Sequence, residues 1–171
     1  MFNQVAVFSS DRYRAGLTDQ EWGTPHELDE RFAEMCEYVR RGVLRVSRDR
    51  WWTLHDLEPV DNWTRNRVTL LGDAAHAMLQ YLAQGAAQAL EDSACLGYFM
   101  AKHSDDVGQA FAAYQAERLP RTSRVQTWAR RMGDIVHAEG TFAIVRDRLL
   151  AAEPNADFEY FDWLYGYRCP S

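Results

Sequence analysis

The sequence predicts an incomplete α/β fold in which a few strands on the N-terminal side are followed by a mainly helical C-terminal region. Two observations carry this prediction. Short runs rich in Val and Phe, which are typical of strands, come before residue 72, whereas apolar residues at three- and four-residue spacing dominate from residue 85 onward. The chain has 171 residues, 47% of them hydrophobic, so it is long enough to bury a core without disulfides.

The first 57 residues predict one helix and several short strands. The helix spans His26–Arg41, because its apolar residues recur on one face, Thr24 is a good N-cap, and Gly42 stops it. The expected strands are Phe2–Phe8, Val43–Val46 and Trp51–Leu57.

The clearest strand is Arg67–Leu71, which we expect to be buried and which runs into Gly72-Asp73. Helical patterns follow, and the second of them ends at Pro120, a residue that breaks helices. The aromatic tail must cover something, and packing on the chain's own helices is favoured over contact with a neighbouring subunit. The expected helices and tail are Gly85–His103, Phe111–Leu119, Arg121–Val136, Thr141–Ala152 and Phe158–Tyr167.

Composition excludes several classes of protein. The chain has 19 basic and 25 acidic residues, for a net charge of −6, which is unsuited to strong nucleic-acid binding. Its three cysteines form no CxxC pair, so neither a disulfide framework nor structural zinc is expected. No stretch approaches the roughly 20 apolar residues that cross a bilayer, and the N-terminus does not resemble a signal peptide. We therefore expect a cytoplasmic protein with neither nucleic acid nor a membrane as its partner.

Candidate chemistry gathers where the clearest strand ends. Gly72 permits a tight turn and a close ligand approach, and Asp73 would lie at the strand's carboxyl end, where open α/β sheets place ligands. Its carboxylate could accept hydrogen bonds from a sugar or polyol, hold a metal, or simply close an Asx-turn. Gln84-Gly85-Ala86-Ala87 then opens a helix whose first N–H groups attract negative charge.

His76 has two interpretations. It could be a base or a metal ligand, but a loop histidine hydrogen-bonded to backbone is favoured. A metal pair formed with Asp73 would need a third ligand, and none lies at a telling spacing. No metal site is predicted.

The run Gly72–His76 (GDAAH), then Gln84-Gly85 and Glu91-Asp92-Ser93, resembles the second flavin-binding motif of single-component FAD-dependent aromatic hydroxylases. The segment Tyr114–Arg121 resembles the helix after that motif. Similarity is greatest to the branch of 3-hydroxybenzoate 6-hydroxylase and salicylate hydroxylase, through residues 78–85 and the ending Phe161–Tyr167. The resemblance covers nearly all of this chain but only the C-terminal part of that family.

The resemblance implies a flavoprotein hydroxylase fold, FAD as cofactor, NAD(P)H as co-substrate, and hydroxylation of a hydroxybenzoate-type aromatic with O2. Asp73 would bind the ribityl chain, and the N–H groups of Ala86 and Ala87 would face the N1–C2=O edge of the flavin. No residue is assigned as catalytic. The full set comprises Gly72, Asp73, Gln84, Gly85, Ala86 and Ala87 for the cofactor, and Met78, Gln80 and Tyr81 for the substrate. For Gln80 and Tyr81, an ordinary solvent-facing loop pair is an equal alternative.

The family's first cofactor motif, GxGxxG, does not occur in this sequence. We therefore expect a fragment that is inactive without an N-terminal half or a complementing chain, with homodimerisation as a further expectation. Residues 1–57 would be a remnant of the substrate domain, 58–103 the second FAD-binding segment and 104–171 the C-terminal helical region. The alternative function is a non-catalytic helical module for binding or dimerisation.

Overall fold

The computed structural model describes residues 4–14, 22–152 and 161–170. The chain divides into two compact units, Met1–Thr53 and Leu54–Ser171, and each is described by itself.

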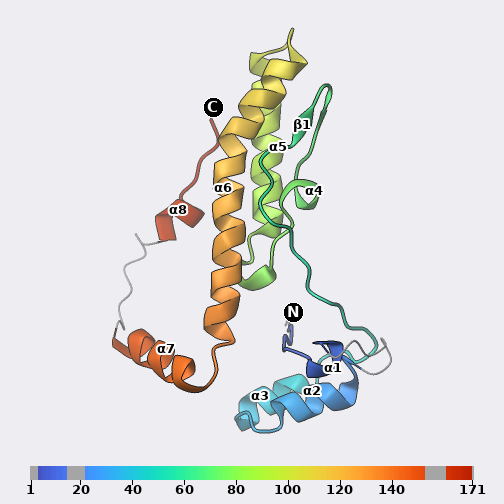
Figure 1. The fold of residues 1–171 in the computed structure, drawn as a ribbon, viewed down its shortest axis with the longest axis vertical. Helices are drawn as coiled ribbons and strands as arrows, with labels where there is room; N and C mark the ends of the chain where they lie inside the picture. The colour runs from blue at the N-terminus through green and yellow to red at the C-terminus, as the bar shows by residue number, and fades with distance from the viewer. Residues whose placement is uncertain (1–3, 15–21, 153–160, 171) are drawn as a thin grey trace. The chain divides into compact units, whose positions relative to one another are not determined.

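Within its described residues, 4–14 and 22–53, the N-terminal unit contains three short helices, α1 (Asp11–Arg14), α2 (Pro25–Phe32) and α3 (Glu37–Val43) (Figure 1). Thr24 caps α2 as predicted, since its hydroxyl accepts a hydrogen bond from the amide of Glu27. The expected single helix over His26–Arg41 is wrong, because the chain turns between α2 and α3. Met35, on the predicted apolar face, is 49% exposed, so that face gains little from the burial that would stabilise a longer helix.

The three strands expected in the first 57 residues are not formed where the structure describes the chain. Phe2 and Asn3 lie outside the described residues, and Gln4–Phe8 form no strand. Val43 ends α3 instead, and Val46 donates a hydrogen bond to its carbonyl in a turn. The physical reason is that a strand needs a neighbouring strand to pair with its backbone groups. Among the described residues, none of these segments pairs with another strand.

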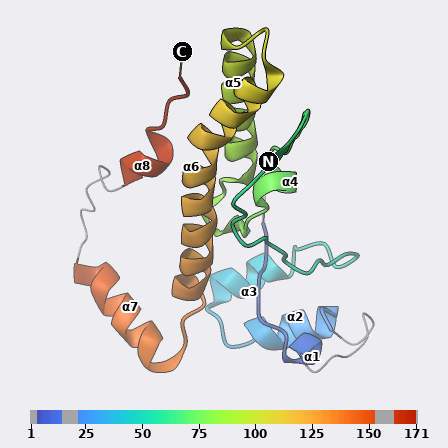
Figure 2. The same cartoon turned by 45° about the horizontal axis from the view of Figure 1, so that its top comes forward.

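The C-terminal unit is built on two long helices, α5 (Gly85–Lys102) and α6 (Val107–Val136), which lie side by side in both views (Figures 1 and 2). Shorter elements surround them. These are β1 (Thr64–Arg65), β2 (Val68–Thr69), α4 (Asp73–His76), the 3-10 helix η1 (Gln80–Leu82), α7 (Gly140–Ala152) and α8 (Asp162–Tyr165).

The predicted strand Arg67–Leu71 is short and forms a hairpin. β2 pairs antiparallel with β1, with Thr64 opposite Thr69. The prediction that this strand is buried is wrong, because Val68 is 64% exposed. In the part of the chain that the structure describes, β2 pairs only with β1, so no second strand covers its outer side.

Pro120 does not end a helix, contrary to the prediction. It lies inside α6, which is continuous from Val107 to Val136. Proline removes one backbone hydrogen bond from the helix, but side chains on both sides of it are fully buried against the rest of the unit, including Tyr114, Arg118, Thr122 and Val125. This burial outweighs the local loss.

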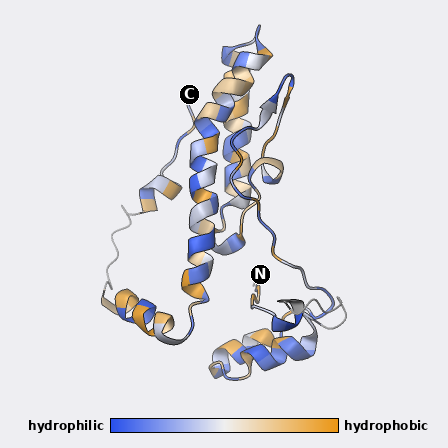
Figure 3. Ribbon diagram, viewed as in Figure 1, coloured by the Kyte–Doolittle hydropathy of each residue, from blue (hydrophilic) through white to orange (hydrophobic). Residues whose placement is uncertain are grey.

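The predicted helices Gly85–His103 and Thr141–Ala152 are confirmed to within one residue at each end as α5 and α7. The described part of the aromatic tail packs on the chain's own helices, as expected, with Leu164 buried; residues 158–160 of that tail lie outside the described residues. α7 differs, since it buries no side chain and carries hydrophobic residues over much of its surface (Figure 3). No helix in residues 4–14, 22–152 and 161–170 is long and apolar enough to cross a membrane.

Candidate functional site

The predicted cofactor turn is formed by a glycine in a conformation that other residues rarely adopt. Gly72 has φ 59° and ψ −143°, which a side chain would strain. A Cβ at this position would lie 3.5 Å from Cβ of Ala89 on α5, so the turn is pressed against that helix. Sequence reasoning was right that Gly72 serves a tight turn, and the structure adds the surface on which the turn rests.

The carboxylate of Asp92, on the next turn of α5, holds the turn in place. Its Oδ2 accepts a hydrogen bond from the amide of Gly72 at 2.9 Å and lies 2.6 Å from Nε2 of His76. Its Oδ1 accepts a hydrogen bond from Nε of Arg118, on α6, at 2.8 Å. Asp92 and Arg118 are both 0% exposed. One buried carboxylate therefore joins the turn, α4 and both long helices.

Electrostatics favours the ionised form of this carboxylate. Burial acts to raise the pKa of Asp92, but the hydrogen bonds with His76, Gly72 and Arg118 outweigh it and hold the pKa below its ordinary value. Burial acts to lower the pKa of Arg118, yet its bond to Asp92 and the charge of Glu91 raise that pKa. The pair is therefore charged, and its hydrogen bonds offset much of the desolvation cost.

The sequence suggested that the ring of His76 bonds to backbone. In the structure the ring bonds to a side chain instead. Its Nε2 faces Asp92, and an ionised carboxylate has only acceptors, so Nε2 carries the hydrogen. Among the described residues, the buried Nδ1 has no hydrogen-bond partner, which suits a bare lone pair better than a second N–H. The ring lies 5.5 Å from that of Trp63. His76 thus supports the turn from inside the core.

A second layer of charges connects Arg118 to the C-terminal tail. Arg118 also donates to Oε1 of Gln88 at 2.7 Å and to the carboxylate of Glu91. Glu91 in turn accepts hydrogen bonds from Arg121 at 2.7 and 2.8 Å. The ring of Tyr167 lies under both guanidinium groups, with centroid distances of 5.2 and 4.2 Å. The tail therefore covers the polar cluster from outside.

The other predicted cofactor residues lie around the same end of α5. Asp73 is exposed in the first turn of α4, directly after the buried Gly72. Gln84 is 6% exposed, Gly85 and Ala87 are half-buried, and Ala86 is exposed. A Cβ placed on Gly85 would meet no atom within 4 Å, so the space beside this residue at the helix terminus is open.

The predicted substrate residues divide into two kinds. Gln80 is exposed, as an ordinary loop residue would be, and Met78 is half-buried. Tyr81 is not a free solvent-facing side chain. Its hydroxyl lies 3.1 Å from Nε2 of His137, and a Cβ on Gly133 of α6 would come within 2.6 Å of its ring. Burial and the nearby charge of Asp134 raise the pKa of Tyr81.

Sequence reasoning missed the polar residues of α6 that hold the loops. Gln126 donates from Nε2 to the carbonyls of Leu57 at 2.9 Å and Ala77 at 3.2 Å. Gln115 accepts a hydrogen bond from the amide of Trp63 at 2.8 Å. A signal was present, because polar residues interrupt the apolar side of α6 at helical spacing, and such positions must find buried partners.

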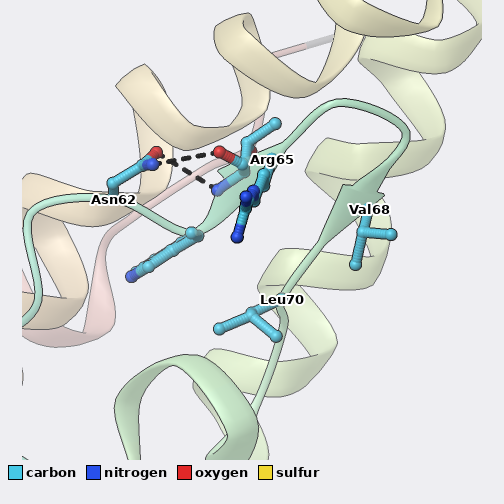
Figure 4. A pocket seen from close by; sticks show the side chains of 6 residues that line it. Asn62, Arg65, Val68 and Leu70 are labelled. Atoms are coloured by element: carbon cyan, nitrogen blue, oxygen red, sulfur yellow. Dashed lines mark hydrogen bonds between the residues drawn. The ribbon is translucent and has the colours of Figure 1, made fainter.

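A separate hollow lies beside the hairpin, with a volume of about 320 Å³. Figure 4 shows Asn62, Arg65, Val68 and Leu70 around it, with the amide of Asn62 bonded to the backbone of Thr64. None of the cofactor or substrate residues predicted from the sequence lines this hollow.

A glycine–aspartate turn packed against a helix, with the N-terminus of that helix nearby, is typical of cofactor-binding segments in α/β proteins. The sequence profile described as "FAD binding domain" matches residues 8–129. The chain therefore belongs to the FAD-binding domain family.

Named relatives agree with this assignment. The chain is 39% identical over 171 residues to 3-hydroxybenzoate 6-hydroxylase 1 of Aquipseudomonas alcaligenes, with 97% of this chain and 42% of the relative aligned. It is 30% identical to salicylate hydroxylase of Pseudomonas putida, over 95% of this chain and 39% of that enzyme. The chain thus spans about two fifths of the length of these relatives.

Solved structures show the same fold. A salicylate hydroxylase substrate complex superposes with a TM-score of 0.65 and 27% identity, covering 88% of this chain and 38% of that one. Klebsiella pneumoniae HpxO complexed with FAD and uric acid superposes with a TM-score of 0.70 and 24% identity, covering 85% and 38%. The incomplete flavoprotein hydroxylase fold expected from the sequence is confirmed.

Proposed function

We propose that this chain forms the flavin- and substrate-facing part of an FAD-dependent monooxygenase that hydroxylates a hydroxybenzoate-type aromatic with NAD(P)H and O2. The observation that carries the proposal is the buried Asp92 carboxylate fixing the Gly72 turn on α5, beside a helix N-terminus with open space at Gly85. The named relatives, which act on hydroxybenzoates and salicylate, support the substrate class.

In this proposal each cofactor residue has a physical task. Asp73, exposed directly after Gly72, accepts hydrogen bonds from the ribityl hydroxyls. The N–H groups of Ala86 and Ala87, together with the dipole of the 18-residue α5, stabilise negative charge on the N1–C2=O edge. Bound FAD supplies the redox chemistry and the activation of O2.

The loop before α5 is assigned to the aromatic substrate. Met78 and Tyr81 provide apolar surface, and the exposed amide of Gln80 is free to turn toward a carboxylate or phenol. Tyr81 is held against α6 through His137, so it would bring a fixed surface to the substrate.

The proposal also names partners. The GxGxxG turn that binds the ADP half of FAD in such enzymes has no counterpart in this sequence. A second polypeptide segment carrying that turn is therefore proposed as the partner, in the cytoplasm. Residues 1–57 would contribute the remaining part of a substrate domain, 58–103 the flavin-facing segment and 104–171 its helical support.

The test is FAD binding with and without that partner. We expect the chain alone to bind FAD weakly or not at all, and expect a yellow complex when the N-terminal part of a 3-hydroxybenzoate 6-hydroxylase is co-expressed with it. In that complex, Asp73→Ala should lower the flavin content while leaving substrate affinity nearly unchanged. Asp105→Ala, the same change at an exposed aspartate in the turn after α5, is the matched control. Unchanged flavin content in the Asp73 variant would remove the assigned role.

The alternative, a helical module that binds or dimerises without flavin, has one supporting observation. α7 exposes a series of large apolar side chains, comprising Phe142, Ile144, Val145, Leu149 and Leu150. A colourless, stable oligomer that takes up no flavin, alone or with the partner segment, would favour this alternative.

A further inference from the structure

We propose that Asp92 is a positioning residue for the cofactor: its buried carboxylate sets the backbone of the Gly72–Asp73 turn, and the C-terminal tail keeps that carboxylate in place through Arg118. This inference deepens the proposed function and rests on it for the identity of the ligand, since Asp73 is the residue assigned to the flavin's ribityl chain.

The first step concerns the turn itself. Gly72 is in a left-handed conformation, and its amide donates to Oδ2 of Asp92. The amides of Ala75 and His76 both donate to the carbonyl of Gly72, at 2.9 Å. Asp92 and α4 thus hold the peptide groups of Gly72 from opposite sides, and they determine the direction in which the chain leaves toward Asp73.

The second step concerns Arg118, which fixes the carboxylate. Its Nε donates to Asp92, Nη1 donates to Glu91, and Nη2 donates to the carbonyl and Oε1 of Gln88. Four of its five N–H groups are therefore engaged, in a rigid planar fork. A guanidinium held at so many points leaves Asp92 little freedom to move away from the turn.

The third step brings in the tail. Tyr167 lies against the guanidinium of Arg118, and its hydroxyl donates to Glu117 at 2.8 Å. Arg121 donates to the carbonyls of Trp163 at 2.6 Å and Leu164 at 2.9 Å. The tail therefore excludes water from the cluster, which strengthens each charged hydrogen bond within it. A segment more than 70 residues away in sequence supports the cofactor turn.

The test uses NMR on the full chain, with isotope labelling. An amide bonded to a carboxylate resonates downfield, so we expect the Gly72 proton to move upfield in Asp92→Asn. We expect a smaller upfield shift of the Gly72 proton in Tyr167→Ala. Val125→Ala is the control, because Val125 is fully buried on α6 and has no hydrogen bond to the turn. It should lower the melting temperature without moving the Gly72 resonance.

The second readout is titration with FAD, followed through the amides of Gly72, Asp73 and Gly85–Ala87. In the complex of the wild-type chain with the co-expressed partner segment, these resonances should shift together. In Asp92→Asn the apparent Kd for FAD should rise by about tenfold, because a turn that the carboxylate no longer holds must be ordered when FAD binds. Val125→Ala should leave the Kd unchanged.

The outcomes separate the two proposals. If FAD shifts no resonance in the wild-type chain or in its complex with a partner, the proposed function fails, while the Gly72 resonance still decides the positioning role. If the Gly72 resonance and the FAD affinity stay the same in Asp92→Asn, or change equally in Val125→Ala, the positioning role is overturned. Should Asp92→Asn fail to fold, Tyr167→Ala decides: a moved Gly72 resonance supports the proposal, and an unmoved one overturns it.

Discussion

The two units of this protein use the same interaction, arginine with a carboxylate, in opposite surroundings. In the N-terminal unit Arg31 bonds Asp11 at 2.7 Å with both side chains exposed to solvent. In the C-terminal unit Arg118 bonds Asp92 at 2.8 Å, and neither is exposed at all. Water already solvates the first pair, so losing it costs little. Water does not solvate the second pair, so removing one member leaves the other as an uncompensated buried charge.

The largest test of this contrast is Arg118→Ala. It removes the guanidinium that pairs with the buried carboxylate of Asp92, so we expect the C-terminal unit to lose about 3–5 kcal/mol of unfolding free energy. Urea unfolding followed by tryptophan fluorescence measures it. The double variant Arg118→Met with Asp92→Asn removes both charges and should recover part of the loss. A double variant no better than the single one would show that packing, not charge, is decisive.

Acid should weaken the same unit by a smaller amount. The pKa of Asp92 is lower in the folded chain than its ordinary value of 3.8, so its ionisation adds stability above that value. This contribution is lost as the pH falls below 3.8 through the folded pKa. The urea midpoint should drop in that range, and Asp92→Asn should show a smaller drop than wild type. An identical pH dependence in the two would assign the acid sensitivity to other carboxyl groups.

Tyr114→Phe tests a neutral hydrogen bond in the same core. The hydroxyl of this buried tyrosine donates to the carbonyl of Leu70 at 3.2 Å. Leu70 comes two residues before Gly72. Removing it leaves a carbonyl without that donor and should cost about 1–2 kcal/mol, less than removal of the buried charge. Thermal unfolding is the measurement. A loss as large as that of Arg118→Ala would contradict the ranking by charge.

Arg31→Ala should have the smallest effect. The exposed pair with Asp11 should contribute less than about 1 kcal/mol, and added salt should reduce even that. Calorimetry of wild type and variant, at low and high salt, measures the difference. If this change destabilised the chain as strongly as Tyr114→Phe, the distinction between the two units would not hold.

The elements predicted well are those whose information is local. α5 and α7 begin and end within one residue of expectation, because apolar spacing and end residues act within a few positions of each other. The turn at Gly72 was also recognised, since few residues other than glycine adopt its conformation. The elements predicted poorly depend on distant partners. The strands expected in the first 57 residues pair with no other strand among the described residues, and the helix through Pro120 is continuous because residues on both sides of the proline are buried.

The candidate site divides in the same way. The sequence named Gly72, Asp73 and the opening of α5, whose chemistry is carried by consecutive residues. It did not foresee that His76 bonds Asp92, nor that Arg118 completes the cluster.

The sequence by itself determined the family, the bounds of α5 and α7 and the glycine turn that the proposed function assigns to a flavin, because motifs and periodicity are properties of neighbouring residues. Only the tertiary structure decided what holds those residues in place. Asp92 and Arg118 are 26 positions apart, and a charge can be buried only where the fold brings its opposite charge and its hydrogen-bond donors to the same point.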